Sequence, residues 1–180
     1  MSHTLLIYNI YDMKQAFFSS PIGLVRIMVE NGHVTHLEFT DEETQAVGSY
    51  TAEAQACSCV DGEDGRMAME TLRQLEQYFK GERRDFDLPL CPLGTDFQRK
   101  AWQVLRQIPY GETISYGEQA RRMGCPKGAR AVGGANHHNP LPILIPCHRV
   151  VAAHGLGGYG EGIERKKYLL RLEGALPKED

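Results

Sequence analysis

The spacing of apolar positions along the chain first predicts a β-hairpin. The segment "QAFFSSPIGLVRIMVENGHVTHLEFT", residues 15–40, reads as two extended runs rich in Phe, Val, Ile and Leu. They are joined at Asn31-Gly32, the dipeptide that best fits a two-residue type I′ turn. Further along, apolar residues recur at helical spacing up to the stop at Gly81, at Met69, Leu72, Leu75, Tyr78 and Phe79. The first half therefore reads as a small α+β unit.

The second half begins with a helix whose start is marked in the sequence. Thr95 and Gln98 make a T-x-x-Q capping box. Apolar residues then recur until Pro109 and Gly111 stop the run, at Phe97, Ala101, Val104, Leu105 and Ile108. This pattern predicts a core helix.

Two short helices joined at "GCP" follow and predict a helix-turn-helix. Ser115 and Glu118 open the first, over roughly 115–123, and Gly124 ends it. Pro126 sits where the first residue of the second helix would be, and "KGARAVGGANHHN" continues it for about three turns.

Two prolines and a glycine in "LPLCPLGT" place a domain boundary near residue 91. We therefore predict an α+β protein with two domains. Residues 1–91 form a small N-terminal α+β domain with an antiparallel hairpin or sheet. Residues 92–180 form a mainly helical, winged-helix-like C-terminal domain that contains the helix-turn-helix.

The formal net charge of −3 hides an asymmetry between these halves. Residues 1–91 carry a net charge of −8 and residues 92–174 a net charge of +6. A basic half favours a polyanionic partner, although a surface of this charge is also common on proteins that never bind nucleic acid.

Cysteine usage and hydropathy bear on the compartment. No stretch approaches the roughly 18 uninterrupted apolar residues of a membrane span, and the N-terminus lacks an export-signal pattern, so we expect a cytoplasmic protein without a membrane partner. Five scattered cysteines argue against disulfides. Cys57 and Cys59 form a C-x-C without a second pair, which favours a solvated loop over a metal site.

The predicted second helix of the helix-turn-helix is almost free of side chains, and Arg130 is the only long one in its middle. Each interior glycine costs about 1 kcal/mol relative to alanine. Two explanations are open at this point: tight packing against another helix, or close approach to a nucleic-acid groove.

The run "LPILIPCHRVV" ends an apolar segment with Cys147 beside His148. Inert burial is the ordinary fate of such a cysteine, because a reactive thiol needs a base or a cation nearby. Downstream, Glu173 lies four residues after Leu169 on the inward face of a predicted helix, where a carboxylate needs a partner unless the helix end is frayed and solvated. Cys147, His148 and Glu173 would together make a nucleophile, a base and an orienting acid.

Several motifs, in order, resemble those of the O6-alkylguanine-DNA alkyltransferases: "GETISYG", "ARAVGGA", "NPLPILIPCHRV" and "YLLRLEG", over about residues 95–174. The resemblance implies irreversible transfer of an alkyl group from O6-alkylguanine, and from O4-alkylthymine, in double-stranded DNA to Cys147, after the base is flipped out. It implies that His148 takes the thiol proton through a water molecule, that Glu173 holds the imidazole, and that Tyr116 donates to N3 of guanine.

Further roles follow from the same resemblance. Arg130 would fill the place of the extruded nucleotide, and Asn139 would lie at the hinge before the cysteine strand. Tyr159 and Gly160 would line the base pocket, and the carbonyls of Cys147 and Val150 would accept from the exocyclic amine. The expected DNA contacts beside Arg130 are Lys127, Gly128, Ala129, Ala131, Gly133 and Asn136.

The sequence departs from the vertebrate pattern at three points: the loop from Cys147 to Tyr159 is one residue shorter, Gly160 replaces a serine, and Asn136 replaces an apolar residue. No match to known zinc ligands is found, so we expect no metal. We also expect no cofactor and a monomer. Two alternatives are open: a Cys-His-Glu hydrolase that uses the same three residues and forms an acyl-thioester, and a binding module, either a helix-turn-helix regulator or an alkyltransferase-like protein that recognises lesions without repairing them. The basic helix with Arg130 disfavours the first, and the acceptor cysteine disfavours the second.

Overall fold

The computed structural model describes residues 15–40 and 62–177 of the chain. Cys57 and Cys59 lie outside the described residues. The chain divides into two compact units, Met1–Cys91 and Pro92–Asp180. Within the described ranges, no helix has the length and apolar character needed to cross a bilayer.

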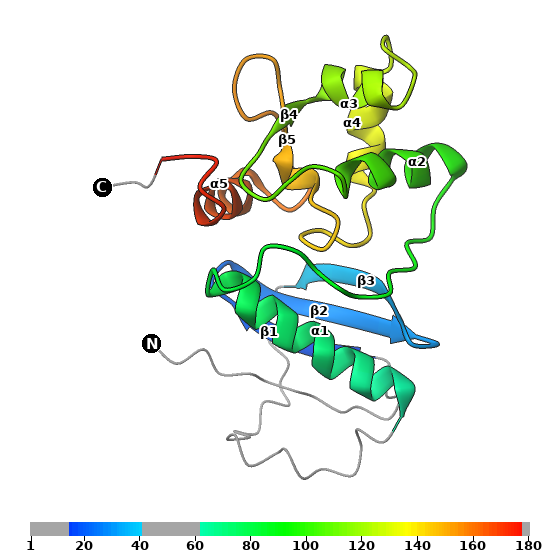
Figure 1. Ribbon diagram of the computed structural model, residues 1–180, viewed down its shortest axis with the longest axis vertical. Coiled ribbons are helices and arrows are strands. Elements are labelled where there is room, and N and C mark those ends of the chain that lie inside the picture. Colours follow the sequence, from blue (N-terminus) through cyan, green and yellow to red (C-terminus); the bar gives the residue numbers. More distant parts are fainter. Residues whose placement is uncertain (1–14, 41–61, 178–180) are drawn as a thin grey trace. The chain divides into compact units, whose positions relative to one another are not determined.

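The first unit is built on a three-stranded antiparallel sheet in the order β1-β2-β3, with β1 at Gln15–Ser20, β2 at Gly23–Glu30 and β3 at His33–Thr40 (Figure 1). Asn31 and Gly32 both have positive φ, 52° and 71°, as the predicted type I′ turn requires. The prediction of a single extended run before this turn is wrong, because the run breaks at Pro21-Ile22 into two strands. Proline cannot donate to a sheet ladder, so this position suits a turn.

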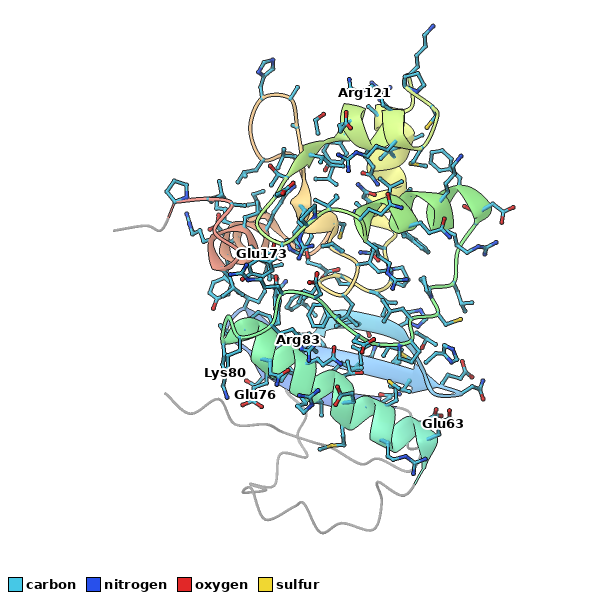
Figure 2. The ribbon with its side chains drawn as sticks, in the orientation of Figure 1. Glu63, Glu76, Lys80, Arg83, Arg121 and Glu173 are labelled. Carbon is cyan, nitrogen blue, oxygen red and sulfur yellow. The ribbon has the colours of Figure 1, made fainter. Side chains whose placement is uncertain are left out.

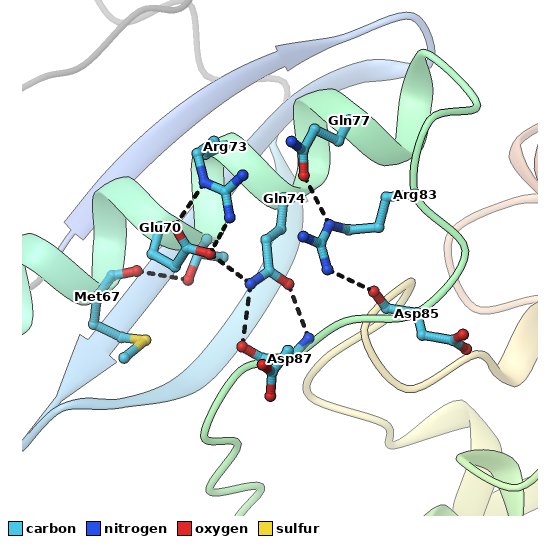
Figure 3. Close-up of polar contacts among 9 residues, drawn as sticks. Met67, Glu70, Arg73, Gln74, Gln77, Arg83, Asp85 and Asp87 are labelled. Atoms are coloured by element: carbon cyan, nitrogen blue, oxygen red, sulfur yellow. Dashed lines mark hydrogen bonds and ion pairs between the residues drawn. The ribbon is translucent and has the colours of Figure 1, made fainter.

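Helix α1, Glu63–Phe79, lies across one face of this sheet (Figure 1). Its apolar stripe is buried as predicted at Leu72, Leu75, Tyr78 and Phe79, while Met69 is only half-buried. Buried Gln74 uses its amide as a backbone substitute: it accepts from Asp87 N at 2.9 Å and donates to Asp87 O at 3.1 Å (Figure 3). These two bonds hold the segment that follows α1 against the helix.

The second unit begins with α2, Asp96–Leu105, and both halves of the predicted Thr95–Gln98 capping box are present. The prediction that Phe97 belongs to the core is wrong, since 39% of its surface is exposed. Trp102 occupies the core instead, and its indole N–H donates to Ala135 O at 2.9 Å. That bond joins α2 to the second helix of the helix-turn-helix.

The helix-turn-helix consists of α3, Tyr116–Arg122, and α4, Ala129–His137 (Figure 1). The Ser115 side chain caps α3 by accepting from Glu118 N. The prediction that Pro126 is the first residue of α4 is wrong. Pro126 lies in the turn, and the helix starts three residues later. The Gly128 N–H donates to Cys125 O at 2.7 Å, which closes the turn before the helix begins.

Cys147–Arg149 form one turn of 3₁₀ helix that leads into β5, Val150–Val151. Strand β5 pairs in parallel with β4, Ile114–Ser115, which immediately precedes α3. Helix α5, Ile163–Leu172, closes the unit with Leu169 and Leu170 fully buried. The Cys147–Arg149 turn thus contacts α2 and α5, and the strand that follows it contacts α3.

Candidate active site

A cavity of about 290 Å³ lies in the second unit, where several segments distant in sequence meet. Helix α3 contributes its first residue, α4 its last turns, the 3₁₀ turn its cysteine, and the loop before α5 its glycines. The lining residues are Tyr116, Gly133, Asn136, His137, Cys147, Gly158, Tyr159 and Gly160. This is room for a small planar molecule.

Cys147 lines this cavity although it is only 8% exposed. Its sulfur accepts a hydrogen bond from Asn139 Nδ2 at 3.1 Å. Burial raises the pKa of the thiol to about 11, and the Asn139 bond offsets only part of this rise. At rest Cys147 is therefore a neutral thiol, and a base must take its proton before the sulfur can act as a strong nucleophile.

Asn139 also shapes the segment that leads to the cysteine. Its side-chain oxygen accepts from Leu141 N at 3.1 Å, and its nitrogen donates to Ile145 O at 2.8 Å as well as to the sulfur. Between them Ile143 has a φ of 74°, a strained conformation for a β-branched residue. The Asn139 side chain thus holds the backbone at Leu141 and Ile145 and also contacts the thiol.

His148 is completely buried, and its Nε2 lies 2.8 Å from Glu173 Oε1. Burial lowers the pKa of His148 even though Glu173 acts in the opposite direction, so the ring is neutral at pH 7. An ionised carboxylate can only accept, so Nε2 carries the proton and Nδ1 keeps a free lone pair. Nδ1 is buried and has no hydrogen-bond partner among the described residues.

Glu173, labelled in Figure 2, caps the C-terminal end of α5 and is buried. Arg149, which the sequence analysis did not single out, donates to both carboxylate oxygens at 2.9 and 3.0 Å. Burial alone would raise the pKa of Glu173, but the bonds from His148 and Arg149 outweigh it and lower the pKa to about 2. The orienting acid is therefore ionised at every pH where the protein would be used.

The segment after α2 closes over this carboxylate. Gly111 has a φ of 80°, and a Cβ on it would come within 2.8 Å of the Glu173 carbonyl oxygen. The Arg149 guanidinium also donates to Ile108 O at 2.7 Å, and the Tyr110 hydroxyl donates to Leu172 O at 3.0 Å. Glycine is needed at position 111 because both the backbone conformation and the space exclude a side chain.

The two tyrosines of the cavity are protonated at neutral pH. Burial raises the pKa of Tyr116 and raises that of Tyr159 well above its usual value. The Tyr116 hydroxyl donates to Gly158 O at 3.3 Å. A Cβ at Gly160 would lie 3.3 Å from His137 Nδ1. A side chain at position 160 would therefore press against the His137 ring.

Val150 lies beside the cavity residues in β5, and its carbonyl oxygen accepts from Lys166 Nζ at 2.6 Å. The guanine acceptor that the sequence predicts there is therefore already bound by a lysine in this structure. A carbonyl has two lone pairs, so a second donor can still bind.

The predicted DNA-contacting residues of α4 and of the turn before it divide by exposure. Lys127, Arg130 and Ala131 are exposed, and Gly128, Ala129 and Gly133 are half-buried. Asn136 is only 8% exposed, and its amide exchanges two hydrogen bonds with buried Gln119, at 2.8 and 3.0 Å. These bonds join α4 to α3, and the residue lines the cavity instead of lying on the exposed surface of α4.

Sequence reasoning missed four residues of the site: His137, Arg149, Gly158 and Lys166. Arg149 directly follows His148, so its position was the available signal, but nothing in the sequence gave its partner. Among the residues that the structure describes, no group of three or more His, Cys, Asp and Glu side chains is arranged to hold a metal ion.

Two family models match the chain. The "6-O-methylguanine DNA methyltransferase, DNA binding domain" matches residues 96–175, and the "ribonuclease-like domain" of the same name matches residues 13–92. A methylated-DNA–protein-cysteine methyltransferase of Methanosarcina acetivorans is 43% identical over 164 residues, which cover 91% of this chain and 99% of that protein. A protein of the same name from Mycolicibacterium paratuberculosis is 44% identical, covering 86% of this chain and 88% of its own.

Solved structures give the same picture. The crystal structure of the Mycobacterium tuberculosis O6-methylguanine methyltransferase matches with a TM-score of 0.73 at 39% identity, covering 93% of this chain and 96% of that one. The M. tuberculosis OGT in complex with DNA matches with a TM-score of 0.72 at 41% identity, covering 88% of this chain and 91% of that one.

Proposed function

Since the chain belongs to the 6-O-methylguanine DNA methyltransferase family, we propose that it repairs DNA by moving the alkyl group of O6-alkylguanine onto the sulfur of Cys147. The observation that carries this assignment is the placement of that sulfur. It lines a cavity and lies in the same 3₁₀ turn as a histidine whose ring is held by a buried carboxylate.

The proton path follows from the tautomer of His148. Nε2 donates to Glu173, so Nδ1 is the ring atom that can accept, and a water molecule would carry the thiol proton to it. The imidazolium that forms is stabilised by the ionised Glu173, while Arg149 keeps that carboxylate in place. Formation of the thiolate at an ordinary pH therefore depends on this buried pair.

The chemical step is an in-line displacement at a saturated carbon. The thiolate forms a carbon–sulfur bond as the bond between that carbon and O6 breaks, and the electron pair of the broken bond stays with the guanine. The protonated Tyr116 hydroxyl can donate to N3 of the departing base once it leaves Gly158 O. The product is a thioether, which offers water no carbonyl to attack, so each protein molecule reacts once.

The test is the stoichiometry of transfer. The protein is incubated with excess duplex DNA containing one O6-methylguanine, and intact mass and peptide mapping locate the methyl group. One methyl group per chain, on Cys147, supports the proposal. Many turnovers on the lesion would overturn single-turnover transfer, multiple-turnover reaction with an ester or amide substrate would favour the hydrolase, and tight binding with an unmodified Cys147 would favour a binding module.

The DNA side of the proposal rests on α4, where Arg130 and Ala131 are exposed, and on exposed Lys127 in the turn before it. A base inside a duplex must be rotated out before its O6 substituent can be reached, at a cost of a few kcal/mol. A helix that carries small residues can lie close to the minor groove while Arg130 fills the vacated place. The half-buried Gly128, Ala129 and Gly133 would allow that approach.

Arg130→Ala should slow transfer from duplex DNA by about 10- to 100-fold, which corresponds to 1.4–2.8 kcal/mol. Reaction with free O6-benzylguanine, which needs no flipping, should change less than about threefold. Single-turnover rates on both substrates measure this. Arg122→Ala, which removes an exposed arginine paired with Glu118, is the matched control. Equal losses on the two substrates for Arg130→Ala would contradict the assignment.

The proposal has further parts. They are repair of O4-alkylthymine, the acceptor role of the Val150 carbonyl, a monomeric state, a cytoplasmic location, activity without a cofactor, and functional domains that correspond to residues 1–91 and 92–180.

A further inference from the structure

The loop between β5 and α5 is rich in glycine and yet forms one wall of the cavity. Four of the six residues from 155 to 160 are glycine, and three of the loop's residues line the cavity: Gly158, Tyr159 and Gly160. Gly155 and Gly157 have positive φ, 95° and 70°. Glycine restricts the backbone least, so a wall of this composition needs contacts from elsewhere to keep one shape.

Lys166 of α5 supplies those contacts. Its Nζ donates to Val150 O at 2.6 Å, to Leu156 O at 2.6 Å and to Gly158 O at 3.1 Å. An ammonium has three N–H donors, and here all three are used. The partners lie in the strand before the loop, in the middle of the loop and at the cavity. One side chain therefore restrains the whole segment.

A buried ammonium carries a desolvation penalty that must be offset by its partners. Lys166 is completely buried, and burial lowers its pKa to about 8, while the neighbouring Cys147 acts in the opposite direction. The same charge acts on Cys147 and on His148, and Glu161 also acts on the thiol. The cation is thus set among the reacting groups, and its partners are backbone carbonyls of the cavity loop.

We propose that Lys166 is a positioning residue for alkyl transfer, one that fixes the guanine-facing wall of the cavity through the carbonyls of Val150, Leu156 and Gly158. This inference rests on the proposed function. The lysine does not contact the reacting carbon. It orients the Val150 carbonyl, the implied acceptor of the exocyclic amine, and holds Gly158–Gly160 at the distance that brings the alkyl carbon in line with the sulfur.

Lys166→Met tests this, because methionine keeps much of the length and removes all three donors. A displacement of about 1 Å at a substrate-positioning group can cost about 100-fold in rate. We therefore expect the limiting single-turnover rate of methyl transfer from duplex DNA to fall by about 100-fold. Labelling of Cys147 by iodoacetamide needs the thiol but no guanine wall, and it should change less than about tenfold.

Lys167→Met is the matched control, because Lys167 pairs with Glu164 at the surface of the same helix; it should leave both rates unchanged. Transfer at the wild-type rate in Lys166→Met would overturn the inference, and so would equal losses in transfer and labelling. If Lys166→Met does not fold, Lys166→Gln, with two donors, should show an intermediate loss, and a full rate there would also overturn it. Failure of the proposed function looks different, since the wild-type protein itself would then take up no methyl group.

Discussion

Cys147→Ser should take up no methyl group from O6-methylguanine DNA, with the transfer rate reduced by at least about a thousandfold. A serine hydroxyl is a far weaker nucleophile than a thiolate, and neutral His148 is too weak a base to ionise it. Shape and volume change little, so the cavity and the His148–Glu173 pair should persist. Intact mass after incubation with the lesion, together with lesion binding measured by electrophoretic shift, checks this result.

The chain offers its own control for this experiment. Cys125 is a partly buried free cysteine in the turn between α3 and α4, and Cys91 is an exposed one. Cys125→Ser and Cys91→Ser should both take up one methyl group as the unaltered protein does. A methyl group found on Cys147→Ser would mean that a different atom is the acceptor.

Glu173→Gln should have the second large effect, on both stability and rate. The amide cannot neutralise Arg149, which is 5% exposed, and an uncompensated buried charge costs about 3–5 kcal/mol. The free energy of unfolding measured with urea should fall by that amount. The rate should fall as well, by about 10³- to 10⁴-fold, because an amide that donates to Nε2 forces the proton of His148 onto Nδ1.

Glu118, which is only partly buried and pairs with Arg121 and Arg122 on α3, gives the comparison for Glu173. Glu118→Gln replaces a carboxylate by the same amide at a surface site, and little change in stability or rate is expected. If Glu173→Gln behaved in the same way, the buried carboxylate would have no role in holding the imidazole.

The same carboxylate makes stability depend on pH. The pKa of Glu173 is about 2 when folded and 4.5 when unfolded, so its contribution is complete above pH 4.5 and is lost as pH falls toward 2. The difference corresponds to roughly 3 kcal/mol. His148 acts in the same direction: its folded pKa is depressed, so unfolding takes up a proton below about pH 6.5. The free energy of unfolding should therefore fall as the pH is lowered below 6.5. The difference in this free energy between the unaltered protein and Glu173→Gln should shrink below pH 4.5.

The features that the sequence predicted correctly depend on near neighbours. The Thr95–Gln98 box and the Ser115 cap join residues three positions apart, and the Asn31-Gly32 turn depends on the two residues themselves. A local signal of this kind acts before any tertiary contact forms, because capping and turn geometry involve only adjacent backbone groups. The motifs around Cys147 were legible for a different reason, which is their order and spacing along the chain.

Other features were decided by what packs against them. Phe97 and Trp102 both fit an apolar helix, and only the approach of α4 determines that the tryptophan is buried. Asn136 reads as a polar surface residue, yet Gln119, 17 positions earlier, provides a buried amide partner.

The reactive centre depends on such distant partners throughout. Glu173 meets His148 and Arg149 across 25 and 24 positions, and Lys166 reaches Val150 across 16. The sequence alone determined which residue types the chemistry has available, and where the caps of α2 and α3 and the Asn31-Gly32 turn lie. Only the tertiary structure decided which groups meet, because a buried charge or amide is stable only where folding brings it a partner.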